Sequence, residues 1–138
     1  MINLLIIILG FICIGASNYE CTVIKVMDGD TIRCEIETWP GDFKRISIRV
    51  LGIDTPEKNF PLGKVVKQYT IDTIKNGMIL TLNEVSNDKY AGRALAEVNV
   101  PNIGDWTTHL ISKGYAKPYF GESKEGLWKE CELNMVEC

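Results

Sequence analysis

The chain has 138 residues and a formal net charge of −3. This is the length of a single domain, and the charge excludes a globally basic protein that binds nucleic acid through its overall electrostatic field. The charge is concentrated at one end. Residues 20–121 contain thirteen acidic and thirteen basic side chains, whereas the residues that follow contain five acids and two lysines. Affinity for phosphate must therefore come from a local cluster of cations or from a bound metal.

The N-terminal segment is apolar. Residues 1–19 carry no charged side chain, and residues 4–14 are almost wholly apolar. This run is short for a membrane-spanning helix, which needs about 20 apolar residues. It suits a signal peptide, because the small residues Gly15, Ala16 and Ser17 follow it where a peptidase would cut. We expect residues 1–19 to be the signal peptide of a secreted or extracytoplasmic protein, although no Lys or Arg precedes the apolar run. An uncleaved N-terminal membrane anchor is the alternative.

The first half of the predicted domain, residues 20–138, has the pattern of three strands. Residues 20–27 are rich in β-branched side chains and end at the turn signal Asp-Gly-Asp. Residues 31–37 alternate between apolar and polar side chains, which predicts a second strand leaving that turn. After a Trp-Pro-Gly-Asp break, residues 43–53 alternate in the same way and predict a third strand.

The second half combines helices and strands. Residues 63–75 have the spacing of a helix that stops at an Asn-Gly pair, and residues 106–113 predict a second helix. Residues 78–85 and 94–100 predict two more strands. A final helix is indicated by one apolar stripe, which consists of Leu127, Trp128, Cys131 and Met135. The whole pattern predicts an α+β fold, a five-stranded OB-type β-barrel with three helices.

Four of the five cysteines belong to the predicted domain. Cys13 lies in the apolar segment and would leave with it; the others are Cys21, Cys34, Cys131 and Cys138. An even number of cysteines behind a leader fits an oxidising compartment and disulfide bonds. Zinc is disfavoured, because the chain has no C-x-x-C pair and His109 is its only histidine.

The spacing of the cysteines argues against two local bridges. Cys21 and Cys34 flank the first turn at diagonal positions, which is awkward because bridged Cα atoms must lie within about 7 Å. Cys131 and Cys138 would be roughly 10 Å apart along the axis if the last helix continued. We therefore expect at least one bridge to join the C-terminal tail to the barrel.

Two short motifs place acidic residues where they suit a metal. The first is residues 28–31, Asp-Gly-Asp-Thr, on the predicted turn, and the second is residues 49–57, Arg-Val-Leu-Gly-Ile-Asp-Thr-Pro-Glu, at a strand end. Calcium and magnesium prefer carboxylate, carbonyl and water oxygens. Pro56 biases Thr55 toward an extended backbone, which would fix the direction of the Thr55 carbonyl. The motifs therefore predict ligands for a hard cation.

The second motif also supplies groups that phosphodiester hydrolysis needs. Arg49 offers a planar fork of donors that suits a phosphate. Glu57 lies just beyond the acid, in position for a general base that activates water. Each motif alone is weak evidence, because Asp-Gly is a common hairpin turn and Asp-Thr-Pro-Glu commonly opens a helix or turn. The two motifs in order, with Arg49 ahead of the second, are much more specific.

A third motif completes a resemblance to a known family. Residues 88–96, Asp-Lys-Tyr-Ala-Gly-Arg-Ala-Leu-Ala, follow the two acidic motifs. The three motifs in this order resemble the thermonuclease (staphylococcal-nuclease-like) family, and the similarity extends over about residues 23–128. Two features depart from the family pattern. The link between the second and third strands is longer than usual, and Ala91 is an extra residue that the following glycine can absorb in a bulge or turn.

The resemblance implies a calcium site. Asp30 and Asp54 would bind calcium directly through their carboxylates, and the carbonyl of Thr55 would complete the protein ligands. Asp28 would lie near the metal and act on it through neighbouring groups.

The resemblance also implies catalytic and substrate-binding roles. Glu57 would be the general base, and Arg49 and Arg93 would hold the phosphate and offset its transition-state charge. Tyr90 and Tyr119 match, less closely, residues that contact the nucleotide.

The implied activity is that of a calcium-dependent endonuclease that cleaves DNA and RNA and leaves 5′-hydroxyl and 3′-phosphate ends, acting as a monomer. A catalytically inactive OB-fold that binds single strands is the alternative. It is disfavoured because the acids and arginines of the motifs are all present, whereas the net basic charge typical of such binders is absent. A third possibility is an adhesion or structural domain of the cell surface.

The remaining polar and aromatic residues are expected to be structural. We expect His109 to be a surface or packing residue, and the tryptophans and most tyrosines to lie in the core or its walls. Glu84 and Asp88 are expected to be exposed loop acids, and the acidic tail a solvated helix face.

Overall fold

The structure, a computed structural model, describes residues 18–138. The predicted signal peptide or anchor therefore lies outside the described residues, apart from its last two positions. Within the described part of the chain, none of the helices has the length and apolar character that crossing a bilayer requires.

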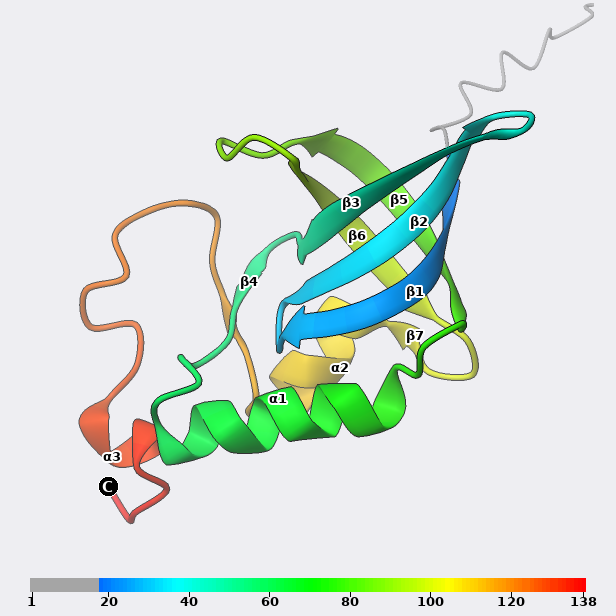
Figure 1. Cartoon of the computed structure of the whole chain (residues 1–138). Helices are drawn as coiled ribbons and strands as arrows, with labels where there is room; N and C mark the ends of the chain where they lie inside the picture. The colour runs from blue at the N-terminus through cyan, green and yellow to red at the C-terminus, as the bar shows by residue number, and fades with distance from the viewer. Residues whose placement is uncertain (1–17) are drawn as a thin grey trace, which may run out of the picture.

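Five strands close into a barrel (Figure 1). They are β1 (Tyr19–Asp28), β2 (Thr31–Trp39), β3 (Asp42–Val50), β5 (Ile79–Asn87) and β6 (Arg93–Val100). Neighbours in the order β3-β2-β1-β5-β6 pair antiparallel, and a parallel pairing of β3 with β6 closes the barrel. The predicted five-stranded OB-type barrel is confirmed.

Short elements surround the barrel. They are β4 (Ile53–Asp54), β7 (Gly104–Asp105), β8 (Lys117–Pro118) and the helices α1 (Pro61–Thr73), α2 (Trp106–Ser112) and α3 (Glu130–Leu133). In Figure 1, α1 and α2 lie beneath the barrel, and the C-terminal segment rises beside β4 before it descends to α3. Helix α3 contacts α1, so the end of the chain returns to the strand–helix junction of the second acidic motif.

Alternation along the strands builds the core. In β2 the side chains of Ile32, Cys34 and Ile36 are buried, whereas their neighbours face outward. Trp106 opens α2 fully buried beneath the barrel, after Asp105 has capped the helix by accepting a hydrogen bond from the Thr108 amide at 3.0 Å. Strand β2 therefore follows from the period-two alternation of apolar residues, and the start of α2 follows from an aspartate, which is a common N-cap residue.

His109 belongs to the packing between the two longer helices. Its ring stacks on Trp106 at 5.2 Å and shares a hydrogen bond with the hydroxyl of Tyr69 on α1. Partial burial, followed by the nearby charge of Lys113, lowers its pKa below the usual value. The expectation of a surface or packing histidine is confirmed.

The predicted third strand is interrupted, and the interruption positions the site. Gly52 has a φ of +85°, a left-handed conformation that glycine adopts readily. Strand β3 therefore ends at Val50, and the next residues leave the barrel as β4, which pairs with β8 through the register Ile53↔Pro118. The amide of Tyr119 donates to the Gly52 carbonyl at 2.9 Å and fixes this departure.

The disulfide prediction was wrong, because the bridges are Cys21–Cys34 and Cys131–Cys138. The first pair is diagonal, since Cys34 lies opposite Val23, but the strongly twisted strands bring its Cα atoms to 5.3 Å. The predicted long final helix is also wrong: α3 ends at Leu133, and Met135 adopts a positive φ that reverses the chain. This reversal brings the second pair of Cα atoms to 5.4 Å.

The β2–β3 hairpin carries the tryptophan that departs from expectation. Trp39 is 71% exposed at the hairpin tip and forms no part of the core, and Phe43 beside it is 61% exposed. The hairpin extends beyond the barrel wall (Figure 1), and its tip shares a pocket with the start of β1. The longer link noted in the sequence therefore projects away from the acidic motifs.

Candidate active site

The two acidic motifs meet where the β1–β2 turn packs on α1. A Cβ atom at Gly29 would lie 2.8 Å from Val66 Cγ1 and 3.1 Å from Thr55 Oγ1, so only glycine lets the turn approach this closely. The approach places Asp30 beside the second motif, where its Oδ2 accepts a hydrogen bond from the Thr55 amide at 3.4 Å. The turn is tightened by a 2.9 Å hydrogen bond from the Gly29 amide to Asp28.

Asp30, Asp54 and Thr55 form a buried group around Arg49. The three residues are only 8, 5 and 6% exposed. The Arg49 guanidinium forms an ion pair with Asp30 through Nη1, and its Nη2 lies 3.6 Å from Asp54 Oδ1. The Nη1 contact lacks hydrogen-bond geometry, so among the described residues this buried donor has no hydrogen-bond partner. The structure thus brings together four of the residues that the sequence singled out.

Glu57 stands apart from this group. Its side chain is exposed, in the turn that leads into α1. The backbone here is tightly packed, because a Cβ atom at Gly63 would come within 1.8 Å of the Glu57 carbonyl oxygen. No cluster of three or more Asp, Glu, His or Cys side chains able to hold a metal occurs in residues 18–138. The backbone of Glu57 is therefore fixed against the start of α1, with its side chain exposed to solvent.

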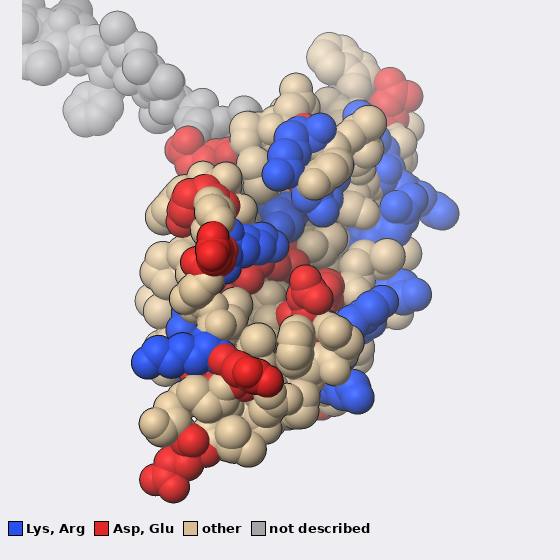
Figure 2. All heavy atoms as spheres, turned by 90° about the vertical axis from the view of Figure 1, so that its left-hand side faces the viewer, with Lys and Arg blue, Asp and Glu red and all other residues tan. Residues whose placement is uncertain are grey.

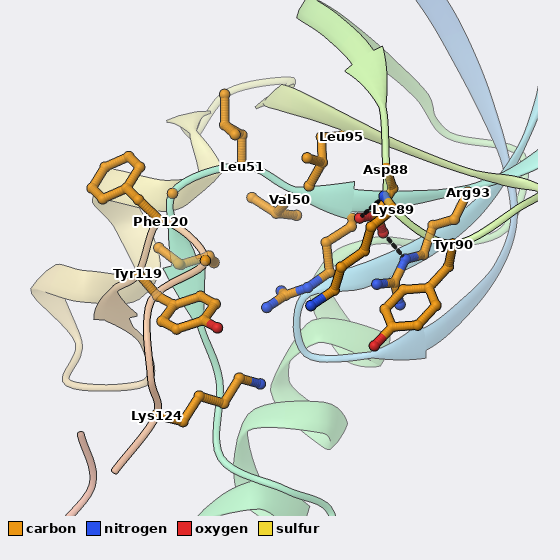
Figure 3. A pocket seen from close by; sticks show the side chains of 14 residues that line it. Val50, Leu51, Asp88, Lys89, Tyr90, Arg93, Leu95, Tyr119, Phe120 and Lys124 are labelled. Carbon is orange, nitrogen blue, oxygen red and sulfur yellow. Dashed lines mark hydrogen bonds and ion pairs between the residues drawn. The ribbon is translucent and has the colours of Figure 1, made fainter. Parts of the chain in front are cut away.

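A pocket of about 410 Å³ adjoins the buried acids. Its lining includes the predicted Arg49, Arg93, Tyr90 and Tyr119. The other lining residues are Val50, Leu51, Gly52, Ile53, Asp88, Lys89, Leu95, Phe120, Gly121 and Lys124. Figure 3 shows Tyr119, Phe120 and Lys124 on one side of the pocket and Tyr90 and Arg93 on the other. Arg49, Lys89, Arg93 and Lys124 give it four cationic side chains against one acid, Asp88. This is a local cluster of cations on a chain with a negative net charge.

Asp88 is part of this site, which corrects the expectation of an exposed loop acid. Its side chain is 7% exposed and forms an ion pair with Arg93 Nε. The pairing follows from the hairpin, because the Asp88 amide donates to the Arg93 carbonyl across the β5–β6 connection. The Arg93 guanidinium also lies 4.6 Å from the centre of the Tyr90 ring. Gly92 has a φ of +78°, so it absorbs the extra residue of the loop as the sequence suggested.

The C-terminal segment adds two contacts that the sequence did not reveal. The indole nitrogen of Trp128 donates a 3.0 Å hydrogen bond to Asp54 Oδ2, and the Lys124 ammonium lies 2.8 Å from Asp54 Oδ1. No sequence motif links these residues to an acid 70 or more positions earlier; the β4–β8 pairing, with Asp54 opposite Lys117, makes the connection. On this side of the molecule acidic and basic side chains are interleaved (Figure 2).

A family model described as staphylococcal nuclease homologue matches residues 47–137. The chain belongs to this family. The match contains Arg49, Asp54 and the pocket residues of the later segments, whereas the Asp30 turn lies before it. Family membership therefore accounts for the second and third motifs. The first motif, the Asp30 turn, lies outside the match, but the structure places it in contact with the second motif at Thr55.

Individual proteins are also similar to this chain over most of its length. An uncharacterized protein of Methanocaldococcus jannaschii is 31% identical over 132 residues, which covers 74% of this chain and 60% of that protein. Uncharacterized endonucleases of Escherichia coli and Haemophilus influenzae are 27 and 29% identical over 80 and 93% of this chain, and over 77 and 70% of their own lengths. This chain therefore spans about 60% of the length of the archaeal relative.

Lys117 ties the C-terminal segment together beside the nuclease-family site. Its ammonium lies 2.7 and 2.9 Å from the two carboxylate oxygens of Glu132 and 4.9 Å from the centre of the Trp128 ring. Glu132 also accepts a 2.8 Å hydrogen bond from the Lys129 amide. The predicted solvated helix face is thus wrong at Glu132, which α3 directs back toward β8.

Replacing Glu132 by glutamine is expected to lower the melting temperature at pH 7 by a few degrees. The hydrogen bond from Lys117, followed by the one from the Lys129 amide, lowers the pKa of Glu132 below its usual value. A carboxyl whose pKa is lower in the folded state stabilises the fold above its unfolded pKa, and this contribution disappears as the pH falls through the folded pKa. The difference between the variant and the parent should therefore shrink as the solution is acidified and vanish once the pH lies below the folded pKa. Thermal unfolding across this range tests it, with Glu137→Gln in the same tail as the control; an unchanged difference at low pH would contradict it.

Proposed function

We propose that the protein is a calcium-dependent nuclease that hydrolyses phosphodiester bonds of DNA and RNA. The observation that carries the proposal is the buried pair of carboxylates, Asp30 and Asp54, next to a pocket with four cationic side chains. Membership of the staphylococcal nuclease homologue family and similarity to proteins named as endonucleases support it. The site thus combines a place for a cation with a place for a phosphate.

The donor set fits calcium. Asp30, Asp54 and the Thr55 carbonyl offer oxygen atoms, which hard cations prefer, and their number leaves further positions for water and substrate. When bound, calcium would supply positive charge that stabilises the phosphoryl oxygens as they become more negative. Asp28, half-buried on the turn, would orient this end of the site through its hydrogen bond to Gly29.

The protein's own side chains would do the remaining work. Arg49 and Arg93 face the same pocket and would bind the phosphate from two sides. Asp88 engages only Nε of Arg93, so the two Nη atoms stay available for phosphate oxygens. Tyr90 and Tyr119 would contact the nucleotide from opposite walls (Figure 3). Glu57, with its carboxylate in solvent, would take a proton from the water that attacks phosphorus. If the P–O5′ bond breaks and the leaving O5′ takes up a proton from solvent, the products have 5′-hydroxyl and 3′-phosphate ends.

Cleavage of plasmid DNA and of RNA by the purified protein tests the proposal. We expect cleavage with calcium, poor cleavage with magnesium because it is smaller and demands stricter octahedral geometry, and none in excess chelator. Full cleavage in chelator would overturn the metal assignment. Retention of single strands without any cleavage in calcium would instead favour the catalytically inactive OB-fold binding module.

We further propose that the protein acts as a monomer outside the cytoplasm, either secreted or anchored by its N-terminal segment. The apolar residues 4–14 and the two disulfides support an extracytoplasmic location, because structural disulfides persist in oxidising compartments. Mass analysis of the native protein distinguishes the two forms. A mature N-terminus between Ala16 and Asn18 indicates cleavage, and a retained Met1 on a membrane fraction indicates an anchor.

A further inference from the structure

The C-terminal segment holds both oxygens of Asp54. Trp128 Nε1 donates to Oδ2 at 3.0 Å, and Lys124 Nζ lies 2.8 Å from Oδ1. Asp54 is 5% exposed, so few other partners can reach its carboxylate. The third neighbour, Arg49, approaches Oδ1 at 3.6 Å. The surroundings of the Asp54 carboxylate are therefore determined mainly by Trp128 and Lys124 of the C-terminal segment.

The two contacts that the C-terminal segment makes with Asp54 differ in how firmly the donor side chain is fixed. The Trp128 ring is half-buried and packs on Lys117, which pairs with Glu132 and lies opposite Asp54 in the β4–β8 ladder. Its indole N–H is a neutral donor fixed by this packing. Lys124, in contrast, has a side chain that is 58% exposed on a long flexible stem. An exposed ammonium can leave a carboxylate at little cost, whereas a packed indole cannot.

We propose that Trp128 is a positioning residue for the metal-binding carboxylate of Asp54, and that Lys124 is a displaceable counter-cation that competes with calcium for Oδ1. The inference rests on the proposed function, since it assigns Asp54 to a calcium site. Trp128 occupies Oδ2 and directs Oδ1 toward Arg49 and the pocket. The Lys124 ammonium neutralises Oδ1 and would repel a metal cation at the same oxygen. It must therefore move away before a metal can bind there.

Two variants test the two roles through metal affinity. Trp128→Phe keeps an aromatic ring near Lys117 but replaces the indole by a smaller ring without the N–H donor. We expect calcium affinity to fall about 10–100-fold, as for other groups that orient a metal ligand. Lys124→Gln removes the competitor, so we expect calcium affinity to rise about three- to tenfold, within the range for one partly exposed ion pair and its charge. An increase in affinity is not produced by partial unfolding, which protects the test from a folding artefact.

Isothermal titration with calcium, at a temperature well below each melting transition, measures these affinities. Lys44→Gln is the matched control for charge, because Lys44 is exposed on β3 and takes part in none of the ion pairs of the described residues. Trp39→Phe is the matched control for the tryptophan, because Trp39 lies exposed at the hairpin tip. Both controls should bind calcium nearly as the parent does.

Terbium luminescence gives a second readout. Because the Trp128 indole contacts Asp54 directly, terbium bound there should be sensitised by tryptophan excitation, and calcium should displace it. The signal should be lost in Trp128→Phe and retained in Trp39→Phe. If Asp54→Asn abolishes calcium binding while Trp128→Phe and Lys124→Gln bind as the parent does, the inference is wrong and the proposed metal site stands. If the parent protein binds no calcium, both are wrong.

Discussion

Replacing Glu57 by glutamine is expected to lower kcat for DNA cleavage by about 10²–10⁴-fold, the range for loss of a general base. Glutamine keeps the size of the side chain but cannot accept a proton from water. Calcium affinity should stay nearly unchanged, because Glu57 lies outside the buried pair of carboxylates. Folding should also be unaffected, because the side chain is exposed and the packed part of the residue is its carbonyl. Initial rates on plasmid DNA at saturating calcium measure the effect.

A matched control for this variant is Glu125→Gln. Glu125 is an exposed acid of the C-terminal segment, and its side chain takes part in none of the ion pairs of the described residues. The Glu125→Gln variant removes the same charge from a side chain of the same size, so its rate of DNA cleavage should match that of the parent. A Glu57→Gln rate near that of the control would rule out Glu57 as the base.

Arg93→Lys is expected to lower kcat by about 10²–10³-fold, as when a transition-state hydrogen-bond donor is removed. Lysine keeps the positive charge but has a single nitrogen. Arg93 uses Nε for Asp88 and offers its Nη atoms to the pocket, so one ammonium cannot serve both partners at once. A lysine drawn to the buried Asp88 would leave the phosphate without this contact. The effect should be larger on kcat than on KM.

The control for the arginine is Arg45→Lys on β3. Arg45 also pairs with a carboxylate through Nε, at 3.1 Å from Glu35, but its side chain is 68% exposed and far along the strand from the pocket. The same chemical change should there leave cleavage unaltered. Near-parental kcat in Arg93→Lys would contradict the proposed phosphate contact.

The parts of the site that sequence could predict are those carried by local motifs. Asp30 and Asp54 lie on a turn and a strand end that the alternation of apolar residues already implied, and the order of the motifs indicated the family. Contacts that depend on distant pairing could not be predicted. The β4–β8 ladder joins only two residues from each side, too few to leave a period in the sequence, so Trp128 and Lys124 gave no signal.

The wrong predictions share a physical cause, which is the curvature of the chain. The Cys21–Cys34 bridge looked unfavourable on flat, ideal strands, and the twist of a small barrel brings the diagonal pair within reach. The final helix looked continuous because its apolar residues keep a helical spacing, but the chain turns back at Met135. Asp88 looked exposed because loop acids usually are, and only the closed hairpin places it against Arg93.

The pairing of β4 with β8 has a consequence for the order in which the protein becomes functional. Asp54 is synthesised more than 60 residues before its partners Lys117, Lys124 and Trp128. Contacts between residues so far apart in the chain form late, because the loop between them must be closed first. We therefore expect a nascent or truncated chain to contain a barrel in which Asp54 still lacks these partners. The candidate site would be completed only after residues up to Trp128 have been synthesised and β8 has paired with β4.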